Sequence, residues 1–145
     1  QNRKKHSVYA MTKSPAFVLA TYIQSNSILV LGTNLFVGAL PDEPILAVAL
    51  YDTIGVDDGK GMDGTLKVHR GVQIIVRSRS YADGWSQLKL FEGLFSTLTN
   101  ETVPIDADSF IIAAVMNTSG PFTLGLNEAK NATDFALNIT MTIEG

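Results

Sequence analysis

Apolar and polar positions follow two different periods along the chain, and each period predicts a different element. Apolar residues recur every three or four positions over residues 81–98, which predicts an amphipathic helix. Residues 68–78 and 135–144 instead alternate between apolar and polar side chains, which predicts strands with one face in a core. The run 45–51 is apolar throughout and is bounded by turn signals, so we expect a strand covered on both faces.

The first apolar segment predicts a helix. Ser14 is a good N-cap and Pro15 suits the first helical turn. Residues 16–23 are apolar almost all round, so this helix must be covered on more than one side. A neighbouring subunit would provide that cover, with Phe17 and Tyr22 as contacts. The alternative is a helix sunk in the core of its own chain.

The order of elements predicts a two-layer α+β fold. Further strands are expected at residues 35–37 and 109–116, whereas turns and a loop are expected over 117–131. Most connections are too short for helical crossovers, so the sheet should be mainly antiparallel, with the helices packed on one face. The length of 145 residues suits one domain, which we place at 14–145 after a basic arm at 1–13.

Residues 52–66 are rich in glycine and aspartate and predict a long loop between two strands. Gly59-Lys60 lacks the spacing of a phosphate-binding loop, and no register supplies the ligands of a calcium loop. We therefore interpret the loop as a partner contact or, alternatively, as a mobile solvent loop. Its candidate contact residues are Asp57, Asp58, Lys60 and Asp63.

Arg77 and Arg79 lie two residues apart, so a regular strand would direct both side chains to its polar face. Two guanidinium groups there could bind the carboxylates of a partner. The alternative is that they only make an exposed sheet face soluble.

Composition argues against an enzyme. There is no cysteine and there are only two histidines, so we expect no thiol, metal or cofactor chemistry and no catalytic residues. A carboxylate enzyme using Asp57, Asp58 and Asp63 lacks an oriented base. The apolar stretches are too short to cross a membrane.

The charges are distributed unevenly along the chain. Residues 1–13 carry four basic and no acidic residues, while all 14 acidic residues follow. Residues 14–145 are therefore acidic on balance, and an acidic domain binds nucleic acid poorly. The arm is either solvated or in contact with an acidic neighbour or nucleic acid.

Four segments together resemble the tail terminator family of long-tailed bacteriophages, also labelled tail completion or minor capsid proteins. The resemblance covers residues 14–145 and rests on the order of these segments. They are Gly32–Pro44, Ala49–Thr53, Gly71–Tyr81 leading into the helix, and Gly120-Pro121 with Leu124–Glu128 and Phe135–Asn138.

The resemblance implies a structural protein of the virion tail or neck, assembled in the host cytoplasm. Such proteins form a homo-oligomeric ring, usually of six subunits, that caps the tail tube and stops its growth. The ring then joins the tail to the head connector, and DNA passes through its lumen without specific contacts. A head-completion stopper or a tail tube protein is the alternative.

Overall fold

The computed structural model describes residues 13–60, 66–127 and 131–144, which form two helices and six strands. The elements are α1 (Pro15–Ser25), β1 (Leu35–Val37), β2 (Ala47–Lys60), β3 (Leu66–Ser78), α2 (Tyr81–Ser96), β4 (Glu101–Ile105), β5 (Asp108–Asn127) and β6 (Ala132–Glu144).

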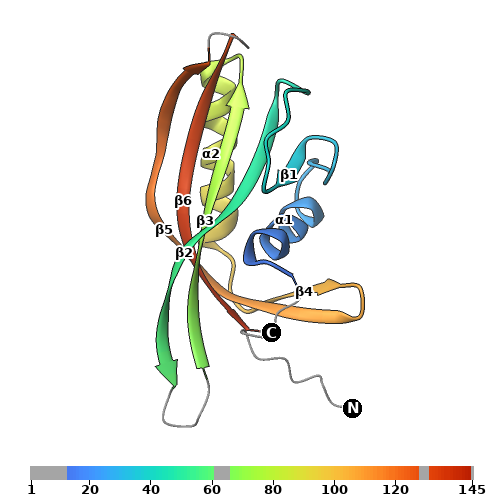
Figure 1. Cartoon of the computed structure of the whole chain (residues 1–145), viewed down its shortest axis with the longest axis vertical. Helices are drawn as coiled ribbons and strands as arrows, with labels where there is room; N and C mark the ends of the chain where they lie inside the picture. The colour runs from blue at the N-terminus through green and yellow to red at the C-terminus, as the bar shows by residue number, and fades with distance from the viewer. Residues whose placement is uncertain (1–12, 61–65, 128–130, 145) are drawn as a thin grey trace.

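All six strands belong to one curled sheet in the order β1-β2-β3-β6-β5-β4. Every neighbouring pair is antiparallel except β1 and β2, which are parallel. Both helices pack against the same face of this sheet (Figure 1). The predicted fold class, a mainly antiparallel sheet with helices on one face, is therefore confirmed.

The core lies between the sheet and the two helices. Alternate residues of β3 (Val72, Ile74 and Val76) point to the helical side and are fully buried, as the period of two predicts. Residues 47–50 of β2 are buried on both faces, which confirms that part of the prediction made from the apolar run 45–51. The strand begins only at Ala47, and Leu46 before it is exposed.

Helix α2 contributes the apolar residues of its C-terminal half to this core. Leu88, Phe91 and Phe95 are buried, but Tyr81 is 58% exposed and Trp85 is 36% exposed. The two exposed rings stack with centroids 6.5 Å apart, and Tyr81 also meets the edge of Phe135 at 5.2 Å. Tyr81 and Trp85 therefore lie outside the core, although they belong to the apolar periodicity that predicted the helix.

The two glycines of α2 differ in their surroundings. A Cβ at Gly84 would clash with the ring of Phe135, so the helix approaches β6 most closely at this residue. A Cβ at Gly93 would meet nothing within 4 Å. Helix α2 is therefore closely packed against β6 at Gly84 and has open space beside Gly93.

The predicted loop 52–66 is instead mostly strand. β2 continues to Lys60 and β3 begins at Leu66, with register shifts between Thr53 and Val56 and between Asp57 and Lys60. Glycine and aspartate lower strand propensity, but cross-strand pairing and two bulge-like irregularities accommodate them here. The tip, residues 61–65, lies outside the described residues.

The turns and loop predicted over 117–131 are also largely wrong. β5 runs on to Asn127 and pairs with β6, with irregularities that include Gly120 and Gly125, both at positive φ. Glycine allows the strand to bend there without ending. β4 was not predicted, because a five-residue strand containing Pro104 carries a weak signal.

Candidate interaction surfaces

The N-terminus of α1 is fixed by two side-chain acceptors. The Ser14 hydroxyl accepts from the backbone N–H of Phe17 at 3.2 Å, as predicted for an N-cap. The Asp52 carboxylate, from β2, accepts from the N–H of Ala16 at 2.9 Å. A carboxylate at this end also suits the helix dipole, so β2 sets the position of α1 on the sheet.

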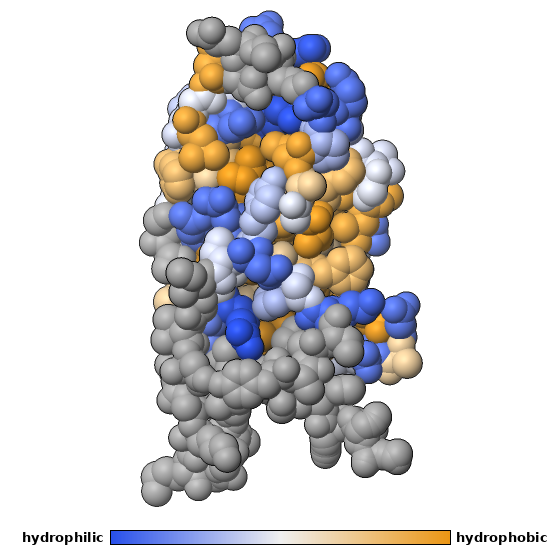
Figure 2. Space-filling model, viewed as in Figure 1, coloured by the Kyte–Doolittle hydropathy of each residue, from blue (hydrophilic) through white to orange (hydrophobic). Residues whose placement is uncertain are grey.

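Beside α1 lies an apolar groove of about 580 Å³ that no described residue fills. Gly32 and Gly38, both at positive φ, form the turns on either side of β1, and this segment makes the wall opposite α1. Figure 2 shows apolar residues gathered on this face, over α1 and β1, with hydrophilic residues above and below. The groove is lined by Ser14, Phe17, Leu31, Gly32, Leu35, Phe36, Val37 and Ala39.

Phe17 is half-buried at this groove, with the Lys13 Nζ 5.5 Å from the centre of its ring. The same Nζ lies 3.6 Å from Asp106 in the turn between β4 and β5. Phe17 therefore remains a candidate contact residue, flanked by a cation at the edge of the groove.

Tyr22 is not exposed for contact with a partner. It is buried in the chain's own core, where burial raises the pKa of its hydroxyl and the nearby Glu101 raises it further. Most of the apolar surface of α1 is buried there too, including Val18, Leu19 and Ile23. Because the curl of the sheet brings β4 beside α1, the prediction of Tyr22 as an interface residue is wrong.

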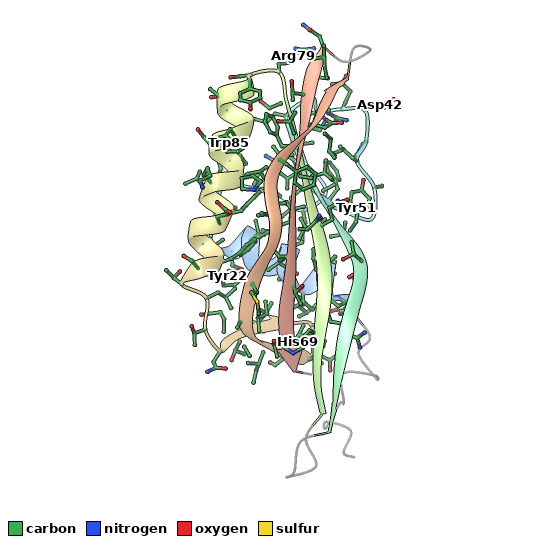
Figure 3. All side chains as sticks on the ribbon, turned by 90° about the vertical axis from the view of Figure 1, so that its left-hand side faces the viewer. Tyr22, Asp42, Tyr51, His69, Arg79 and Trp85 are labelled. Atoms are coloured by element: carbon green, nitrogen blue, oxygen red, sulfur yellow. The ribbon has the colours of Figure 1, made fainter. Side chains whose placement is uncertain are left out.

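The hairpin formed by β2 and β3 projects beyond the last pair that β3 makes with β6 (Figure 1 and Figure 3). β6 accompanies β3 only as far as the pair His69–Thr142, whose Nδ1 and Oγ1 atoms lie 2.8 Å apart. Within the described residues, Leu66 and Val68 then pair only with Lys60 and Asp57. We call residues 56–60 and 66–68 the ribbon.

The ribbon contains three of the four contact residues predicted for the loop. Asp57, Asp58 and Lys60 lie in its first strand, whereas Asp63 lies outside the described residues. The sequence assigned these residues to a loop, whereas the structure places them in a strand, and their role as contact residues stays a prediction.

Arg77 is buried, being only 3% exposed, and it binds the connection between β1 and β2. Its Nε donates to the carbonyl oxygen of Ile45 at 2.8 Å, and its Nη2 donates to those of Pro41 at 2.5 Å and Pro44 at 2.7 Å. These bonds hold a connection without a helix between two parallel strands. The predicted pair of exposed guanidinium groups is wrong at Arg77.

Arg79 follows the end of β3 and is exposed. It lies at the opposite end of the sheet from His69 and the ribbon (Figure 3). Because the strand ends at Ser78, the alternation that would place Arg77 and Arg79 side by side does not reach Arg79.

Asp134 was not identified by the sequence analysis, and it lies opposite Arg77 across β3 and β6. Burial raises the pKa of its carboxyl, and the charge of Arg77 partly opposes that shift. Its Oδ1 is buried and has no hydrogen-bond partner among the described residues. Burial also raises the pKa of the nearby Tyr51, and the charge of Asp134 adds to this. The alternation of apolar and polar residues over 132–144 is the signal that could have identified Asp134 as a residue of the polar face.

Next to this pair, the helix-free face of the sheet is uncharged. The cross-strand rows through Gln73 and Gly71 contain Tyr51, Asn138, Thr53, Thr140 and Met116 on that face. Exposed sheet faces usually carry charged residues, and depletion of charge is typical of interface cores.

The described residues contain no group of three or more histidine or acidic side chains placed to hold a metal ion. Neither of the two helices in this part of the chain is long and apolar enough to span a membrane.

A small α+β domain with an unfilled apolar groove and a projecting ribbon is suited to be a component of a protein assembly. Residues 22–144 match the family described as bacteriophage tail terminator protein, so the chain belongs to that family. A search of curated proteins found no significant match. Family membership confirms the resemblance and gives the protein a structural role in the phage tail, as a component of the virion.

Proposed function

We propose that the chain forms a closed ring that caps the tail tube, ends its growth and joins the tail to the head connector. The observation that carries this proposal is that one small chain has two different candidate contact surfaces, the groove and the ribbon. A ring of identical subunits needs two such surfaces, because each subunit meets its neighbours through different faces. The family resemblance favours six subunits.

The contacts with partners would come from the candidate residues that the chain's own core does not bury. Phe17 lies at the groove, Arg79 at the far end of the sheet, and Asp57, Asp58 and Lys60 in the ribbon. Asp63 is included by its position in the sequence alone. The ribbon would contact the tail tube or an adjacent subunit.

The role we propose is structural and not catalytic, and DNA would pass through the ring without specific contacts. The uncharged rows through Gln73 and Gly71 on the helix-free face and the acidic balance of residues 14–145 support this, because duplex DNA slides past surfaces that do not displace its counterions. We place the ring at the neck of the tail and its assembly in the host cytoplasm.

Two measurements test the proposal. Native mass spectrometry of the full chain should show a ring and not a monomer. Tails assembled without the protein, imaged by negative stain, should have uncontrolled lengths. Tails of normal length that fail to join filled heads would instead indicate a head-completion stopper, and loss of the tube itself would indicate a tube protein.

A further inference from the structure

Residues 39–46 connect β1 to β2, and Arg77 of β3 binds the backbone of this connection. The guanidinium group donates to three carbonyl oxygens of residues 41–45, at distances of 2.5–2.8 Å. On either side of the connection, the N–H groups of Gly38 and Val48 make hydrogen bonds of 2.9 Å between the β1 segment and β2. Arg77 therefore helps to hold β1, and with it one wall of the groove, against the sheet.

Asp134 offers the same guanidinium group a second acceptor. It is the cross-strand partner of Arg77, and it lies on the face of the sheet opposite to Phe135, which belongs to the core beneath the helices. The Oδ1 atom of Asp134 is buried and has no hydrogen-bond partner among the described residues. An ionised carboxylate accepts stronger, charge-assisted hydrogen bonds than a backbone carbonyl does. Once Asp134 ionises, the carboxylate and the connection therefore compete for one donor.

The titratable groups near Asp134 come from β2, β3 and the connection. They are Tyr51, Arg77, Asp42 and Glu43. The partner of Asp134 on β5 is Gly125, which has no side chain, and both helices lie on the other face of the sheet (Figure 1). Burial raises the pKa of the Asp134 carboxyl, and the charge of Arg77 opposes that shift. Arg77 is therefore the charged group that ionisation of Asp134 affects most directly.

We propose that Asp134 and Arg77 form a pH-dependent latch on the connection between β1 and β2. With Asp134 protonated, the guanidinium group stays on the carbonyl oxygens and the connection is closed. When Asp134 ionises, its carboxylate draws the guanidinium group toward β6, so the carbonyl bonds weaken and the connection opens more often. The latch goes beyond the proposed function and does not require the ring, because all of its groups belong to one chain. One wall of the groove is then held most firmly in acid.

Hydrogen–deuterium exchange of the full chain tests the latch, with rates corrected for the pH dependence of exchange in unstructured peptides. Peptides that contain Gly38 and Val48 report on the connection. Between about pH 4 and pH 7 their corrected exchange should rise about three- to tenfold, as expected for an opening equilibrium coupled to one ionisation. Peptides from the centres of β3 and β6 should change less. Asp134→Asn should remove the response, whereas the matched control Asp42→Asn, which removes a carboxylate from the connection itself, should retain it.

Every other result overturns the latch. A response of equal size in β3 and β6 would mean that ionisation destabilises the whole fold and not the connection. A response that persists in Asp134→Asn, or that disappears in Asp42→Asn, would assign the pH dependence to another group. Exchange that is independent of pH in the parent protein would mean that Arg77 keeps its carbonyl bonds when Asp134 ionises.

Discussion

Arg77 and Asp134 lie opposite each other on β3 and β6, but the arginine donates its hydrogen bonds to other groups. The guanidinium group donates to three backbone carbonyl oxygens of residues 41–45, and Asp134 Oδ1 remains buried without a hydrogen bond. The arginine is thus an anchor for a backbone connection. For the aspartate, burial disfavours the ionised form of the carboxyl group.

This relationship gives a pH dependence of stability. Burial raises the folded-state pKa of Asp134 above its ordinary value of 3.8, against the weaker effect of Arg77. The folded protein therefore binds this proton more tightly than the unfolded chain does. The contribution of Asp134 to stability is most favourable below pH 3.8 and is lost as the pH rises through the raised pKa.

Asp134→Asn should remove this loss, so the stability of the variant relative to the parent should be greater at pH 7 than at pH 3. Urea unfolding at a series of pH values measures it. A variant that loses stability at pH 7 but not at pH 3 would show that attraction to Arg77 outweighs burial.

Replacement of Arg77 should destabilise the fold strongly. Arg77→Met fills similar space but leaves the carbonyl groups of Ile45, Pro41 and Pro44 without their donor. A hydrogen bond from a charged donor contributes about 1.5–3 kcal/mol, and three part-buried bonds are lost together, so we expect a loss of about 3 kcal/mol in the free energy of unfolding. Arg79→Met is the matched control, and as an exposed substitution it should change stability by no more than about 0.5 kcal/mol. Equal effects of the two substitutions in chemical denaturation would contradict this role for Arg77.

The two helical glycines should respond in opposite directions to alanine. Gly84→Ala drives a methyl group into the ring of Phe135 and should cost about 1–3 kcal/mol. Gly93→Ala meets open space and should stabilise α2 by about 0.5–1 kcal/mol. Thermal unfolding of both variants against the parent measures the difference. A stabilised Gly84→Ala protein would mean that α2 does not approach β6 as closely as described.

Removal of the ribbon should separate folding from assembly. Replacing residues 58–67 with Asn-Gly joins the directly paired Asp57 and Val68 by a two-residue hairpin turn. The core lies beyond this pair, so unfolding free energy should stay near that of the parent. If the ribbon binds an adjacent subunit, the ring should be lost in native mass measurements, and if it binds the tail tube, the ring should persist. In both cases tails should grow to uncontrolled length. If the shortened protein still forms rings and terminates tails normally, the ribbon is not an assembly contact.

The sequence predicted those elements whose signals are local and periodic. The buried alternation of Val72, Ile74 and Val76 and the lower stripe of α2 follow directly from residue spacing, because each period fixes which side chains share a face. The N-cap at Ser14 is local as well, since its partner lies three residues away. These signals were sufficient for the fold class.

Signals that depend on a strand partner were misinterpreted. Glycine and aspartate predicted a loop over residues 52–66, but cross-strand pairing with residues 66–72 keeps most of this segment extended. The same holds for β5 beyond Asn117, which β6 supports despite Gly120 and Gly125. Propensity describes a residue in isolation, and pairing within a sheet overrides it.

The sequence by itself determined the class of fold, the buried strands and the absence of cysteine chemistry, because composition and periodicity act residue by residue. Only the tertiary structure decided that Arg77 is an anchor, that Tyr22 is buried and that Asp134 lies opposite a guanidinium group. Each of these depends on which strand ends where and on what the curl of the sheet brings beside it. The same reason separates the groove from the ribbon: an apolar or charged residue becomes part of a surface only when the packing of distant segments leaves it without a partner.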